Sequence, residues 1–313
     1  MKLFDLHCDT ISDCYNKNKS LYDGDLHISL ERGKKYSPWF QCFAIWITDD
    51  RRGKVALDYF DAVLGKLHQE IAQHSEILML CKTAEDFRTA EKQKKIGAVL
   101  TVEGGAAAGG RLERLQYMAD CGVKAITLTW NSSCEIGDGA GVEGSKGLTE
   151  FGKLAVKEME RLHMAVDVSH ASDKLFYDVA ECTEKPFIAT HSNSRKVCGG
   201  NQWARRRNLT DEQFNIIKSR GGIVGVNLVP EFLTDSGEAG GEDILRHIEH
   251  FLSLGGEKCV AFGSDFDGTE LPRGFTGIES VEEVAELMLR RNYSEALVNS
   301  ILFDNAYQFF LSL

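Results

Sequence analysis

The sequence predicts an α/β protein folded as a (β/α)8 barrel, and three observations support this prediction. Apolar strand-like segments recur eight times along the chain. Segments with the periodicity of amphipathic helices separate most of them. Histidine and carboxylate residues come directly after several of the apolar segments, which is typical of a barrel with its active site at the C-terminal ends of the strands. A doubly wound sheet of eight strands is the structural alternative.

The length and composition fit one large domain. The chain has 313 residues, of which 43% are hydrophobic and 27% are charged, as is ordinary for a soluble globular protein with a large core. It contains only four prolines and no low-complexity run, so no linker divides it. We therefore expect a single domain over residues 1–313.

Charge and hydropathy exclude several classes of partner. The formal net charge of -11 argues against a general nucleic-acid binder, whose affinity rests on neutralising phosphates. Residues 1–5 contain no apolar run long enough for a signal peptide, and no stretch approaches the length that spans a bilayer. We expect a cytoplasmic protein that binds no membrane. The nine cysteines are scattered without a Cys-x-x-Cys pair, so they are interpreted as reduced, mostly buried residues.

The N-terminal half begins with the strand 3–9. Because strand side chains alternate between faces, Asp5, His7 and Asp9 are expected on one face and apolar residues on the other. After an irregular stretch, the further strands are 40–48 and the near-continuous apolar run 96–103, which ends in a carboxylate, as expected of a buried parallel strand. The predicted helices of this half are 55–74, 84–94 and 111–120, the last closed by a glycine at its C-terminus.

The C-terminal half continues the alternation. Its predicted strands are 123–129, 164–170, 187–191, 222–228 and 259–265. Its predicted helices are 147–163, 172–182, 210–219, 242–254, 281–290 and 294–310. The helix from residue 210 opens with Thr-Asp-Glu, a favourable helix start.

Polar residues gather at the C-terminal ends of five predicted strands. Three histidines and three carboxylates in one ring would bind two divalent ions, and imidazole together with carboxylate favours zinc or a similar metal. Glu103 has two oxygens and can bridge the pair, whose shared hydroxide would serve as nucleophile. These residues are His7, Asp9, Glu103, His170, His191 and Asp265. We interpret His68, His74, His247 and His250 as solvated residues of helices, without ligand spacing.

The chain resembles the membrane (renal) dipeptidase family of the amidohydrolase superfamily. The resemblance rests on blocks that span nearly the whole chain: Asp5–Asp9, Thr101–Gly105, Asp167–Ser172, Thr190–Ser192, Arg206–Asn208 and Gly263–Gly268. Amidohydrolases of other branches begin with His-x-His, whereas this chain begins with His7-Cys8-Asp9.

The resemblance implies a role for each matching residue. His7 and Asp9 would hold one zinc ion, His170 and His191 the other, and Glu103 would bridge them. Asp265 would act as the general acid–base. Arg207 would pair with the C-terminal carboxylate of the substrate. A dipeptide substrate, tolerance of a D-residue at its C-terminal position and a homodimer are also implied.

One position departs from the family pattern. Relatives of the mammalian enzyme carry a histidine after the fourth strand, where this chain has Trp130 followed by Asn131. That histidine is expected to stabilise the developing oxyanion. Trp130 offers only one indole N–H, and Asn131 is an alternative donor, so both are expected to contact the substrate.

The alternatives concern activity rather than fold. Another amidohydrolase reaction on the same metal site, such as hydrolysis of an N-acyl amino acid or a lactone, is one alternative. A catalytically silent binding protein is the other. The motif Gly139-x-Gly141-x-x-Gly144 matches a dinucleotide fingerprint, but it does not follow a strand directly and is interpreted as a flexible loop.

Overall fold

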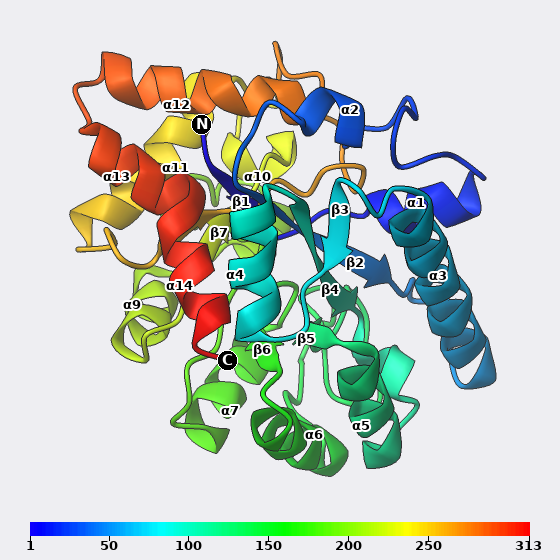
Figure 1. The fold of residues 1–313 in the computed structure, drawn as a ribbon. Helices are drawn as coiled ribbons and strands as arrows, with labels where there is room; N and C mark the ends of the chain where they lie inside the picture. The colour runs from blue at the N-terminus through cyan, green and yellow to red at the C-terminus, as the bar shows by residue number, and fades with distance from the viewer.

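The computed structural model describes all residues 1–313, and it contains one sheet of eight strands, all paired in parallel. The strand order is β6-β5-β4-β2-β1-β8-β7, with β3 paired to β4. The strands lie at the centre of the molecule with helices around them (Figure 1). The strands are β1 Leu3–Asp5, β2 Trp39–Trp46, β3 Leu78–Leu80, β4 Ile96–Glu103, β5 Val123–Thr127, β6 Ala165–Asp167, β7 Val224–Val226 and β8 Val260–Phe262.

The predicted long helices are confirmed with small shifts of their ends. These helices are α3 Lys54–Gln73, α4 Ala84–Gln93, α5 Leu112–Cys121, α6 Glu150–Arg161, α7 Asp173–Cys182, α9 Asp211–Ser219, α11 Gly241–Ser253 and α12 Val281–Arg290. The last predicted helix is divided into α13 Glu295–Asn299, a π-helix and α14 Asn305–Leu311. Four short helices were not predicted from the sequence: α1 Thr10–Asn16, α2 Leu30–Gly33, α8 Gln202–Arg207 and α10 Pro230–Leu233.

Two strand predictions need correction. The first strand ends at Asp5, and Asp9 precedes helix α1 as its N-cap. Residues 187–191 form no regular strand. Ile188 makes a single parallel bridge to β6, and Ala189 makes one to β7. The next two backbone amides donate to side chains instead of a neighbouring strand. Thr190 N–H donates to Asp167 Oδ1, and His191 N–H donates to Ser169 Oγ.

The sheet is curled, and two apolar clusters hold it in place. A cluster of 70 buried residues joins the sheet to the surrounding helices. A second cluster of 18 includes residues of the strands, Ile188 and the C-terminal aromatic residues. In it the Phe4 and Phe310 rings lie 5.3 Å apart, as do the Phe40 and Phe87 rings. Because Phe40 comes early in β2 and pairs with Phe4 of β1, this aromatic packing supports the end of the sheet opposite the predicted site.

None of the helices combines the length and the apolar character that crossing a membrane requires.

Candidate active site

The polar residues that follow the strands meet at one end of the sheet. His7 follows β1, Glu103 is the last residue of β4, and Asp265 follows β8. Because all the strands are parallel, their C-terminal ends lie at the same edge. Two groups of possible metal ligands result, one formed by His7, Glu103 and His191 and the other by His7, Asp9 and Asp265.

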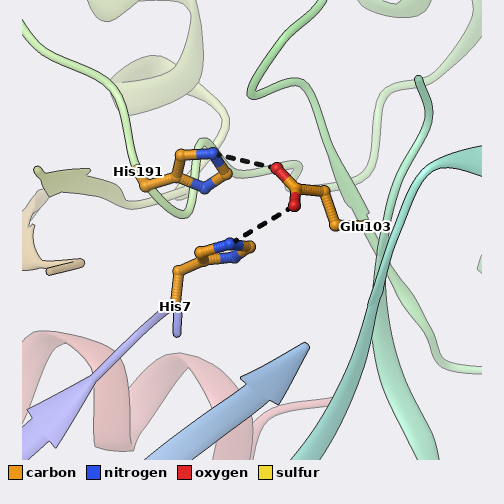
Figure 2. Close-up of side chains that lie close together, drawn as sticks. All are labelled: His7, Glu103 and His191. Carbon is orange, nitrogen blue, oxygen red and sulfur yellow. Dashed lines mark ion pairs between the residues drawn. The ribbon is translucent and has the colours of Figure 1, made fainter. Parts of the chain in front are cut away.

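Glu103 lies between the histidines, and its two oxygens face different rings. Its Oε2 lies 3.7 Å from His7 Nε2, whereas its Oε1 lies 3.3 Å from His191 Nε2 (Figure 2). His170 Nε2 also lies 2.8 Å from Oε1. One oxygen of Glu103 therefore faces His7, and the other oxygen faces His170 and His191.

Hydrogen bonds orient His170 and His191. His170 Nδ1 donates to Asn131 Oδ1 at 2.8 Å. His191 Nδ1 donates at 2.9 Å to the hydroxyl of Thr190, which in turn donates to Asp167 Oδ2 at 2.6 Å. A hydrogen on each Nδ1 leaves the lone pair on Nε2, the arrangement that a metal-ligating histidine needs.

The donor atoms at this site fit divalent cations. His7 Nε2 and Asp9 Oδ1 are buried and have no hydrogen-bond partner. Each lies near the other at 3.8 Å, and Asp265 Oδ1 lies 3.8 Å from the same His7 nitrogen. Buried polar atoms without partners are costly, and a cation bound among them would remove that cost.

Burial controls the protonation of the site residues. It lowers the pKa of His7 to about 3 and those of His170 and His191 well below their ordinary value, so the three rings are neutral at pH 7. Burial also works to raise the pKa of Glu103, but His7 and His170 outweigh it and lower that pKa. Burial first, and then the Glu103 charge, raise the pKa of Asp265 well above its usual range.

A cavity of about 210 Å³ opens beside these ligands. Trp130, Asn131 and Arg207, the three residues predicted to contact the substrate, line it. Arg207 is only 4% exposed, its guanidinium lies 5.2 Å from the centre of the Phe232 ring, and its Nε and Nη2 have no partner. Burial lowers its pKa to about 10, so it remains cationic at neutral pH. An anionic group entering the cavity would find these two free donors.

Unusual backbone conformations and a closely packed glycine occur at the site. Asp265 has a φ of 64° and His170 a φ of 65°, left-handed values that non-glycine residues seldom adopt. Gly268 lies against two carboxylates, since a Cβ there would lie 2.4 Å from Asp265 Oδ1 and 2.5 Å from Asp9 Oδ2. Only glycine fits beside these side chains without displacing them.

Two residues lie elsewhere than the sequence indicated. Asp5 does not share the site with His7 and Asp9, because its carboxylate accepts hydrogen bonds from Gln41 and Ser264. His247 is not solvated. It is fully buried, and it accepts from the backbone N–H of Ser194 and donates to the carbonyl of Leu233.

Several residues that surround the cavity were not predicted from the sequence. Trp46 ends strand β2, and the others lie on loops or short helices. An apolar run with a polar end had singled out the ligands, and no such local pattern marks these positions. They are Trp46, Trp203, Val229, Glu231, Phe232 and Thr269.

Comparison with known proteins agrees with this geometry. Residues 1–311 match the model of the membrane dipeptidase family, peptidase family M19. The chain belongs to this family. As a member of the membrane dipeptidase family it is a metal-dependent dipeptidase hydrolase, and the predicted family is confirmed.

Relatives of the chain cover 77% to 99% of it. The dipeptidase AC, a metallopeptidase of family M19, is 28% identical with a TM-score of 0.90, over 99% of this chain and 98% of its own. A metallopeptidase from Rhodobacter sphaeroides, bound to a phosphinate mimic of L-Ala-D-Ala, is 27% identical with a TM-score of 0.90 over the same shares. An uncharacterised protein of the pqqA 5' region of Klebsiella pneumoniae is 33% identical over 77% of this chain and 91% of its own.

Proposed function

We propose that this protein is a dipeptidase on a closed (β/α)8 barrel, that it uses two zinc ions, and that it accepts a D-residue at the C-terminal position of its substrate. The observation that carries the metal part of the proposal is the position of Glu103 between His7 on one side and His170 and His191 on the other. The bridges of Ile188 and Ala189 to β6 and β7 support the closed barrel.

The ligands divide into two sets around Glu103. His7 and Asp9 would hold one ion, and His170 and His191 would hold the other, with one oxygen of Glu103 toward each set. When bound, divalent ions polarise the carbonyl of a peptide bond and lower the pKa of water.

Asp265 moves the proton in the proposed reaction. Its carboxylate lines the cavity and lies 3.8 Å from His7 Nε2. As a carboxylate it accepts a proton from the attacking water and then passes it to the nitrogen of the leaving amino acid, because it lines the cavity beside the candidate ligands.

Three residues that line the cavity position the substrate: Arg207, Trp130 and Asn131. The free Nε and Nη2 donors of Arg207 bind the C-terminal carboxylate. Trp130 and Asn131, which line the same cavity, contact the dipeptide. The L-Ala-D-Ala mimic in the Rhodobacter sphaeroides relative supports a dipeptide ligand with a D-residue at its C-terminus.

The test is turnover of L-Ala-L-Ala and L-Ala-D-Ala by metal-stripped protein, before and after addition of zinc. We expect alanine release that depends on zinc, with two ions bound per chain. Two bound ions without release from either dipeptide would contradict the dipeptidase proposal. Release from an N-acetyl amino acid in its place would identify a different amidohydrolase activity.

A further inference from the structure

Two short helices form one side of the cavity, and neither supplies a predicted metal ligand. Helix α8 contributes Trp203 and Arg207, and helix α10 contributes Glu231 and Phe232. We call these four residues the α8–α10 wall. The Trp203 and Phe232 rings lie 6.3 Å apart, and the Arg207 guanidinium lies over the same Phe232 ring.

Glu231 places a free negative charge on this wall. Its side chain is exposed, lines the cavity, and makes no ion pair or hydrogen bond. Its backbone is fixed, since the carbonyl of Glu231 accepts from Asn201 Nδ2 at 3.2 Å. Arg207 is the single Lys or Arg side chain that lines the cavity, and its guanidinium lies against Phe232. The Glu231 carboxylate therefore remains available to a ligand.

The other carboxylates of the cavity are different in kind. Asp9, Glu103 and Asp265 are buried at the candidate metal site, whereas Glu231 is exposed on helix α10. Trp203 and Phe232 line the same cavity as Glu231, and aromatic rings attract cations through their faces. This combination suits the ammonium or guanidinium of a lysine or arginine side chain.

We propose that the α8–α10 wall selects dipeptides with a basic C-terminal residue, with Glu231 as the residue that determines this specificity. The inference rests on the proposed function, in which Arg207 binds the C-terminal carboxylate. Because Arg207 and Glu231 both belong to the α8–α10 wall, we place the side chain next to the bound carboxylate along this wall. The substrate's α-amine lies across the scissile bond from that carboxylate. Acidic C-terminal residues are disfavoured, because like charges repel.

The experiment compares kcat/KM for L-Ala-L-Lys, L-Ala-L-Ala and L-Ala-L-Glu with the zinc-loaded full chain. The expected order is Lys, then Ala, then Glu, with a lysine-to-alanine ratio of about tenfold, since one partly exposed ion pair and one cation–π contact together supply that much. Glu231→Gln should bring the lysine-to-alanine ratio close to one. Glu231→Lys should raise kcat/KM for L-Ala-L-Glu above that for L-Ala-L-Lys. Glu238→Gln, which removes an exposed charge from the following loop, is the matched control and should leave the ratio unchanged.

Three other outcomes would overturn the inference, and one of them would overturn the proposed function as well. Hydrolysis of L-Ala-L-Ala without a preference for lysine would overturn the inference and leave the proposed function intact. An equal loss on all three dipeptides in Glu231→Gln would also overturn it, because Glu231 would then act on a group common to all of them. Hydrolysis of none of the three would overturn the proposed function, and this inference with it.

Discussion

The Nε2 atoms of His170 and His191 lie 2.9 Å apart, and the hydrogen bonds on the far sides of both rings leave a lone pair on each of these atoms. Two lone pairs at this distance repel each other. Protonation of either ring would relieve the repulsion, but burial lowers the pKa of both histidines. A cation shared by the two nitrogen atoms is the arrangement that satisfies them.

Loss of the Asn131 side chain should weaken metal binding. In Asn131→Ala the ring of His170 loses the acceptor that fixes its orientation, and metal affinity should fall by about 10- to 100-fold. Titration of the metal-stripped protein with zinc against a competing chelator measures this. Ser132→Ala, at the neighbouring exposed position, is the control and should bind zinc as the unchanged protein does.

Asp265→Asn should retain both metal ions but lose most turnover. An amide keeps the size of the carboxyl group but cannot accept and return the proton, so kcat should fall by about 10²- to 10⁴-fold. Metal content by mass spectrometry and kcat on L-Ala-L-Ala are the two measurements. Glu270→Gln, an exposed charge in the same loop, should change neither. Activity preserved in Asp265→Asn would rule out the proton-transfer role.

Arg207→Ala should mainly weaken the binding of substrates with a free carboxylate. Losing charged hydrogen bonds to that group should raise KM by about 10- to 100-fold. Because Arg207 is buried against Phe232, the substitution also changes the packing around that ring. The comparison with a C-terminally amidated dipeptide separates the two effects, since a packing defect would reduce hydrolysis of both substrates equally.

His247 should make the fold less stable in acid. Burial lowers its pKa from 6.5 to about 4, so the folded protein holds this ring neutral while the unfolded chain binds a proton. The stabilisation is complete above pH 6.5 and is lost as the pH falls toward 4. Its size is on the order of 3 kcal/mol.

Denaturant unfolding between pH 7 and pH 4.5 checks the His247 prediction. His247→Gln removes the titrating ring. The free energy of unfolding should then depend less on pH than in the unchanged protein, even if the variant is less stable at pH 7. His68→Gln, which replaces an exposed histidine of helix α3, serves as the comparison variant. Parallel pH curves for His247→Gln and the unchanged protein would contradict the prediction.

The sequence by itself determined the family, the parallel α/β sheet and the set of residues that meet at its C-terminal edge. Apolar runs ending in Glu103 or preceding His7 are local patterns, and parallel strands bring their ends together whatever the details of packing. Long amphipathic helices were equally predictable, because each carries its own periodicity.

Only the tertiary structure decided which polar residues are buried and what surrounds the cavity. His247 lies on a helix and resembles a solvated residue in sequence, but Ser194 and Leu233 from distant segments enclose it. Asp5 alternates correctly with His7 in sequence, yet it bonds to Gln41 and Ser264. Glu231 belongs to a helix of four residues, too short for a periodic pattern. The burial of a residue and its hydrogen-bond partners depend on contacts between segments far apart in the chain. Local sequence patterns do not predict these contacts.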